Sequence, residues 1–176
     1  RALSQQGSLW KELGQGGVIR RLRSRDVWAG RWQRHVAAAA VPVSELQPPP
    51  EFPSDRIPTA DMLGLSMERA GQPGGRRAAE RVLQGFLLER GETYRSAMSS
   101  PLEGAAACSR LSPYLALGVI SIRETYHALQ KRRDALPPGP VSGPWRGSLQ
   151  SFRSRLQWRD HFMQKLEDQP SIEFEN

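Results

Sequence analysis

Residues 108–118, with the sequence CSRLSPYLALG, predict a short helix that begins at an anion-binding loop. Ser112 is a suitable N-cap, Pro113 suits the first helical position, and Gly118 can end the turn that follows. Free backbone N–H groups at a helix start attract anions, and here two hydroxyls and one guanidinium accompany them. The stretch therefore predicts a site for an anion.

The last predicted helix, over residues 149–167, carries two stripes with different chemistry. The apolar stripe has near-heptad spacing and is expected in the core; it comprises Leu149, Phe152, Leu156, Met163 and Leu166. The other stripe has the spacing i, i+3, i+4, i+7, which puts its members on one face; it comprises Arg155, Trp158, Arg159 and Phe162.

Arginines that alternate with aromatic side chains favour a charged cavity over a core position. Guanidinium groups hold phosphates, and aromatic rings stack on bases or on other planar heterocycles. The alternative is purely structural: a helix buried on two sides, with its arginines paired to Asp160 or Glu167. The presence of the stretch 108–118 favours the cavity.

Charge points in the same direction. The chain has 176 residues, enough for one domain with a sizeable core, and 25 Lys and Arg against 18 Asp and Glu give a net charge of +7. Nearly all of the base is arginine, because the lysines are Lys11, Lys131 and Lys165. Arginine suits bidentate phosphate contacts, so a polyanionic partner is expected, with a solvated basic surface as the alternative.

Other chemistry is excluded by composition. The single cysteine, Cys108, rules out a disulfide within the chain and indicates a reducing, intracellular and cytoplasmic compartment. The histidines are isolated, so no metal site is expected, and no apolar run is long enough to predict a membrane partner. The chain begins with Arg1 and stops in mid-pattern at Asn176, which indicates a piece of a longer protein.

The remaining pattern predicts a mainly α fold. Apolar residues at three- and four-residue steps predict a helix over residues 76–90. A capping box at Ser121–Glu124 starts another helix, which ends near Arg133. Residues 96–107 and 137–147 are expected to be loops.

One further helix is expected near the start of the chain. Asp26 is a suitable N-cap, Trp28 and Trp32 share a face, and an alanine run continues the helix until Pro42. Strand-like alternation is weak everywhere, and the segments that come closest to it are residues 18–22 and 172–174.

Together, the stretch 108–118 and the run WRDHFMQKL at 158–166 resemble the photolyase/cryptochrome family. The resemblance covers most of the chain and is densest over residues 76–176, which look like the N-terminal half of the helical FAD-binding domain. Residues 41–75, rich in proline and glycine, look like the interdomain linker. Residues 1–40 look like the C-terminal remnant of the α/β antenna domain and the helix after it.

The resemblance implies a set of FAD contacts. Residues 109–112 match the segment that grips the pyrophosphate, largely through backbone N–H groups. Cys108 stands where threonine is common, Phe152 stands where many members have tryptophan, and Arg159 matches an arginine near the flavin. The cofactor-binding set implied in this way is Tyr94, Cys108, Ser109, Arg110, Leu111, Ser112, Phe152 and Arg159.

The resemblance also implies a DNA-binding face formed by Arg155, Trp158 and Arg159. Trp158 matches the tryptophan that stacks on an extruded pyrimidine lesion, and Asp160 replaces a frequent glutamate. Arg155 departs most from the family pattern, because many photolyases have a carboxylate or an amide there. An arginine can hold a phosphate but cannot accept a hydrogen bond.

These matches imply a blue-light-driven, FAD-dependent photolyase that repairs pyrimidine dimers by electron transfer and binds damaged DNA with the dimer flipped out. No catalytic side chain is expected, because the chemistry belongs to the cofactor. A second antenna chromophore would lie outside this chain. Two alternatives stay open: a cryptochrome-type photoreceptor without repair activity, and a flavin-free basic helical module that binds nucleic acid.

Family members place further flavin contacts beyond the position that matches Asn176. We therefore expect this stretch of chain by itself to bind FAD weakly or not at all, and to expose apolar surface.

Overall fold

The computed structural model describes residues 5–7, 9, 16–41, 55–65 and 71–175, and this part of the chain is mainly helical, with no strand. Much of the predicted linker, together with Pro42 and most of residues 1–15, lies outside the described residues. Short 3-10 turns join several helices. The helices used below are α2 (Trp28–Ala37), α3 (Arg76–Leu88), α4 (Tyr94–Ala97), α5 (Gly104–Ala107), α6 (Ser112–Ala116), α7 (Ile122–Asp134) and α8 (Gly143–Asp168).

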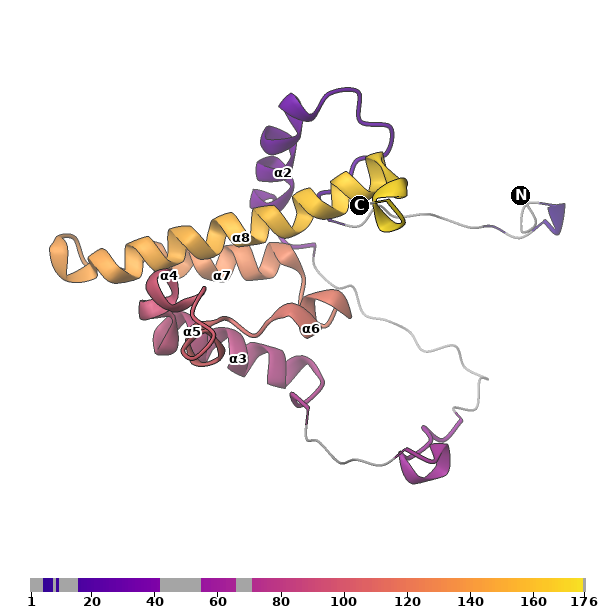
Figure 1. Cartoon of the computed structure of the whole chain (residues 1–176), viewed down its shortest axis with the longest axis horizontal. Coiled ribbons are helices and arrows are strands. Elements are labelled where there is room, and N and C mark those ends of the chain that lie inside the picture. Colours follow the sequence, from indigo (N-terminus) through magenta and orange to yellow (C-terminus); the bar gives the residue numbers. More distant parts are fainter. Residues whose placement is uncertain (1–4, 8, 10–15, 42–54, 66–70, 176) are drawn as a thin grey trace.

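Helix α8 runs through the molecule and separates two groups of elements (Figure 1). It packs beside α7 and contacts α4 and the 3-10 turn Arg90–Thr93. Helices α3 to α6 lie on one side of α8, and α2 lies on the other side, where it also contacts α7.

Buried apolar side chains from all of these layers form one core, and removing their surface from water is the main source of stability. Its members from the first helices are Trp28, Trp32, Val36, Ala79, Leu83, Phe86 and Leu87. Its members from later elements include Tyr94, Leu111, Tyr114, Ile120, Tyr126, Leu129, Trp145, Leu149, Phe152 and Leu156.

The apolar stripe predicted along α8 is correct only as far as Leu156. Beyond it, Met163 is partly buried and Leu166 is 44% exposed. The buried positions are taken instead by two polar residues, Asp160 and Gln164. Helix α8 therefore ends on a polar contact with the N-terminal segment rather than on a continuous apolar seam.

Two local predictions are confirmed by the side-chain contacts. Ser121 accepts from the Glu124 amide and Glu124 accepts from the Ser121 amide, which completes the capping box of α7. Trp28 and Trp32 lie on the same face of α2, and both are buried.

Several predicted boundaries are wrong. Ser24, rather than Asp26, caps the 3-10 turn Arg25–Val27 before α2, and α2 ends at Ala37, where Ala38 turns extended. Residues 104–107 form α5 instead of a loop. Helix α8 begins at Gly143, because Pro144 occupies its first turn and Trp145 is already buried.

The N-cap of α6 also lies one residue earlier than expected. Leu111 is the N-cap, Ser112 is the first helical residue, and no side chain caps the helix. Gly118 adopts φ +67° after the helix, as expected for a glycine that ends a turn. Neither strand-like segment forms a strand, and residues 170–173 form a 3-10 turn.

Candidate functional site

A pocket of about 420 Å³ lies between α8 and the loop that joins α5 to α6. We call it the α6–α8 pocket. Its volume lies within the range of small-molecule sites, roughly 300–1,000 Å³. It is lined by Gln72, Tyr94, Cys108, Ser109, Arg110, Leu111, Ser112, Pro113, Leu115, Phe152, Arg155, Leu156 and Arg159.

The structure brings together nearly all of the residues that the sequence singled out. Every member of the implied cofactor-binding set lines this pocket, as does Arg155. Trp158 does not line it and lies at its rim, where the Arg155 guanidinium stacks 4.8 Å from the centre of the indole ring. Residues from three separate elements thus meet at one place.

Arg90 holds the loop before α6 in place through hydrogen bonds. Its guanidinium donates to the carbonyl oxygens of Cys108, Ser109 and Val82, and the last two distances are 2.9 and 3.0 Å. Burial, followed by the nearby charge of Arg110, lowers the pKa of Arg90, although an arginine stays protonated at neutral pH. No sequence motif marked Arg90, which looked like an ordinary residue at the end of a helix.

Arg110 has the left-handed φ of +60°, which is uncommon for a residue other than glycine. Its carbonyl oxygen accepts from Gln72 Nε2 at 3.0 Å. The Arg110 side chain is exposed at the pocket, and no ion pair to it is found among the described residues. Gln72 was not singled out from the sequence, because nothing in a glycine- and proline-rich stretch indicates that it reaches this loop.

Three consecutive amide groups of this loop lack an acceptor in the part of the chain that the structure describes. Among the described residues, no acceptor is found for the backbone N–H groups of Ser109, Arg110 and Leu111, which lie outside any helix. Unpaired amide donors beside cationic side chains form a favourable environment for an anion. The pocket therefore has the donor set that a phosphate group needs.

The apolar wall of the pocket is aromatic. Phe152 packs edge-on against Phe86, at a ring distance of 4.7 Å, and against Tyr94 at 6.0 Å. Burial raises the pKa of Tyr94, so its phenol stays neutral. A planar ring would find apolar contact on this wall.

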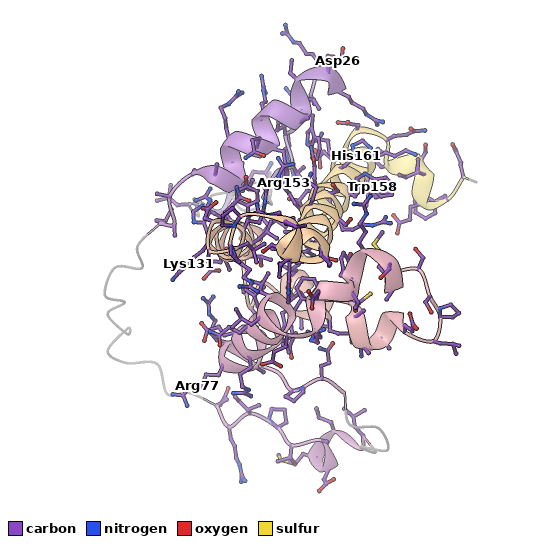
Figure 2. The ribbon with its side chains drawn as sticks, turned by 90° about the vertical axis from the view of Figure 1, so that its left-hand side faces the viewer. Asp26, Arg77, Lys131, Arg153, Trp158 and His161 are labelled. Carbon is purple, nitrogen blue, oxygen red and sulfur yellow. The ribbon has the colours of Figure 1, made fainter. Side chains whose placement is uncertain are left out.

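An exposed aromatic surface adjoins the pocket along α8. Trp158 and Phe162 are 55% and 56% exposed, and their rings meet edge-on at 6.2 Å. Figure 2 shows Trp158 and His161 on neighbouring faces of α8. His161 packs on Trp28 of α2 at 5.5 Å, so its face of α8 lies against α2.

The contact between Arg159 and Asp160 corrects part of the prediction that the arginines of α8 line a charged cavity. Arg159 Nη1 lies 2.7 Å from Asp160 Oδ1, so the structural alternative of pairing within α8 holds for Arg159 but not for Arg155. Asp160 is fully buried and also accepts from Trp32 Nε1 at 2.9 Å. Burial raises the pKa of Asp160, while the Trp32 hydrogen bond and the Arg159 charge lower it.

A second hollow, of about 570 Å³, lies beside the first, and Leu115 and Arg159 line both. Its other arginines are committed to the protein. Arg76 binds Glu80 and Glu124, and Arg123 donates to two backbone carbonyls of the α2 end. With its donors already used, this hollow is a weaker candidate than the α6–α8 pocket.

Other classes of site are not supported. Among the described residues, no group of three His, Cys, Asp or Glu side chains could hold a metal ion. Within the same part of the chain, no helix combines the length and the apolar composition that crossing a membrane requires.

Comparison with known proteins finds a similarity to a photo-lyase. The chain is similar to the deoxyribodipyrimidine photo-lyase of Halobacterium salinarum, with 29% identity over 120 residues, which cover 68% of this chain. The match spans 24% of that enzyme, so the chain corresponds to about a quarter of its relative's length. No family model and no solved structure matches the chain.

Proposed function

We propose that the α6–α8 pocket binds FAD and that the protein is a blue-light-driven photolyase that acts on pyrimidine dimers in DNA. The observation that carries the proposal is the convergence of residues 108–112 with Phe152 and Arg159 around one pocket. The similarity to a photo-lyase over 68% of the chain supports the same class of enzyme.

The residues of the pocket fit the parts of a flavin dinucleotide. The unpaired amides of residues 109–111, with the Arg110 guanidinium, would bind the pyrophosphate. The Phe152 and Tyr94 rings would contact a planar ring, and Arg159 would add a cation, its charge being partly balanced by Asp160. When bound, FAD would supply blue-light absorption and the electron that splits the dimer.

The DNA would meet the protein at the rim. The exposed Trp158 ring offers a stacking surface for an extruded base, and such stacking contributes about 1–3 kcal/mol per base. Arg155 would hold a nearby phosphate while it stacks on the same ring. Extrusion is easiest at a lesion, because a damaged pair is already weakened.

We also propose how the chain divides into domains. Residues 76–176 would form the N-terminal half of the helical FAD-binding domain, residues 41–75 the interdomain linker, and residues 1–40 the end of an antenna domain with the helix after it. A second, light-harvesting chromophore would bind elsewhere in the protein.

One observation favours a second candidate, a cryptochrome-type photoreceptor on the same scaffold. Arg155, which stacks on Trp158, offers no hydrogen-bond acceptor to a flipped base at the position where many photolyases have one. A photoreceptor would need the flavin pocket but no such acceptor.

The test is the absorption spectrum of the purified full-length protein, followed by illumination with an oligonucleotide that contains one pyrimidine dimer. The photolyase proposal predicts a flavin spectrum and light-dependent loss of the dimer. A flavin spectrum without repair would support the photoreceptor instead. A colourless protein that still binds DNA would leave a flavin-free nucleic-acid-binding module.

A further inference from the structure

Arg90 lies at the junction between α3 and the loop that lines the pocket, yet it does not line the pocket itself. It is half-buried, and its guanidinium stacks 5.6 Å from the centre of the Phe86 ring. Its donors bind three backbone carbonyls, two of which belong to the consecutive residues Cys108 and Ser109. Arg90 thus holds the loop by its carbonyl oxygens without lining the pocket.

Because the peptide bond is planar, holding a carbonyl group also fixes the direction of the amide that follows it. In a trans peptide the C=O of one residue and the N–H of the next point in opposite directions, and the described residues contain no cis peptide bond. Because the Cys108 and Ser109 carbonyls point toward Arg90, the amides of Ser109 and Arg110 point away from it. These are two of the amides that lack a protein acceptor.

We propose that Arg90 is a positioning residue that fixes two successive peptide planes so that the Ser109 and Arg110 amides face an anion in the α6–α8 pocket. For the identity of the anion, the pyrophosphate of FAD, this inference rests on the proposed function. The effect of Arg90 on the loop does not depend on it.

The side chain must be arginine for this task. A guanidinium presents several donors in a rigid plane and can reach neighbouring carbonyls at once, whereas an ammonium is a single point on a flexible stem. The main chain around Arg90 is also fixed. A Cβ at Gly91 would come within 2.3 Å of the Phe86 carbonyl oxygen, so no other residue fits there without movement.

The chain carries a probe in the loop that Arg90 binds and a matched control whose hydrogen bond and ring contact lie outside that loop. Cys108 is the single cysteine of the sequence, and its thiol reports on loop opening. Arg132 resembles Arg90 chemically, since it donates to the Leu87 carbonyl oxygen at 2.9 Å and stacks 4.7 Å from the Trp145 ring centre. Arg132 does not line the pocket.

The experiment compares Arg90→Met, Arg90→Lys and Arg132→Met in the full-length protein. Maleimide labelling of Cys108 is followed by peptide mass spectrometry, and the affinities for inorganic pyrophosphate and for FAD are measured alongside. A nearby cation promotes thiol reactivity, so loss of charge alone would slow labelling and an acceleration must report opening of the loop.

We expect Arg90→Met to label about tenfold faster than the wild type and to bind pyrophosphate and FAD about tenfold more weakly, because hydrogen bonds from a charged group are lost. Arg90→Lys should give a labelling rate and affinities between those of the wild type and those of Arg90→Met. Arg132→Met should match the wild type in labelling and affinity even if its melting temperature falls.

The outcomes separate the two proposals. Faster labelling without loss of pyrophosphate affinity would overturn the positioning role, as would unchanged labelling. Pyrophosphate binding that depends on Arg90, without any FAD binding, would support the positioning role of Arg90 and contradict the FAD proposal. A wild-type protein that binds neither ligand would overturn both.

Discussion

The α2 side of α8 and the α6–α8 pocket both carry polar groups, but those groups are satisfied to different degrees within the part of the chain that the structure describes. On the α2 side, Trp32 Nε1 donates to Asp160, and Gln164 exchanges two hydrogen bonds with the main chain of Ile19, at 2.7 and 3.0 Å. Arg153 adds a contact to Gln33 of α2 at 2.5 Å. Figure 2 shows Arg153 and His161 where α8 meets α2.

The pocket side has the opposite character. Within the described ranges, the amides of residues 109–111 have no acceptor, Arg110 is exposed, and Arg155 stacks on the Trp158 ring. Buried polar groups that are fully paired fix a structure, whereas unpaired donors and cations remain available to a ligand. The contrast teaches that the α2 side of α8 is scaffold, and it supports our proposal that the α6–α8 pocket is a binding site.

The largest effect should come from breaking the scaffold at Asp160. Asp160→Ala leaves the Trp32 N–H and the Arg159 guanidinium without their acceptor, and we expect a loss of about 2–4 kcal/mol in the free energy of unfolding. Asp160→Asn keeps an acceptor for Trp32 and should cost less. Urea denaturation measures both, and two variants as stable as the wild type would refute the scaffold role.

Gly17 tests how closely the N-terminal segment approaches α8. It has φ +84°, and a Cβ there would lie 2.9 Å from Trp32 Cδ1 and 3.0 Å from Asp160 Oδ2. Gly17→Ala should therefore destabilise by about 1–3 kcal/mol. Gly64, at φ +63° with no atom near its missing Cβ, is the matched control for the backbone alone. Equal melting temperatures for the two variants would show that Gly17 is not crowded.

Arg155 tests the binding surface without touching the scaffold. Arg155→Ala should weaken binding to single-stranded DNA severalfold and reduce the salt dependence of log Kd by about one unit, because one phosphate contact is lost. Its melting temperature should stay unchanged. Arg77→Ala, which removes an exposed arginine of α3, is the control. Equal losses in both variants would mean that only net charge matters.

The smallest effect concerns the link between α3 and α7. Arg76 of α3 binds Glu124 of α7 at 2.5 Å, and this hydrogen bond lowers the pKa of Glu124 to about 2. A carboxylate with a lowered pKa stabilises the fold above its unfolded pKa of about 4.5 and loses that contribution as the pH falls toward about 2.

We therefore expect the unfolding midpoint in urea to fall between about pH 5 and pH 2, and to fall less in Glu124→Gln. The pair is partly exposed, so the difference should be below about 1 kcal/mol. An identical pH profile in wild type and variant would show that this link contributes nothing.

The sequence singled out most of the residues that line the α6–α8 pocket but missed the contacts of the α2 side. Residues 108–112, Arg155 and Arg159 were identified because their chemistry is unusual for a helical core, and they do line one pocket. The pairing of Asp160 with Trp32 spans most of the chain, and no local pattern reveals it. Arg90 was missed for the same reason, since its partners are backbone carbonyls and carry no sequence signal.

Helix ends were the least predictable part of the fold. Pro144 and the glycines around it looked like a loop, but a proline in the first helical turn costs no hydrogen bond, so α8 begins at Gly143. The polar end of α8 was misjudged because spacing alone cannot show that a buried Gln164 is satisfied by a distant main chain.

The proposal that the α6–α8 pocket binds FAD is tested most directly by titrating the full-length protein with FAD. The titration compares the wild type with Arg110→Glu and Arg31→Glu. Arg31 is an exposed arginine of α2, so both variants change the net charge equally. We predict that Arg110→Glu weakens FAD binding by at least about tenfold at an unchanged melting temperature, while Arg31→Glu binds as the wild type does. Equal affinity in all three proteins, or no FAD binding by the wild type, would contradict the claim that the α6–α8 pocket is the flavin site.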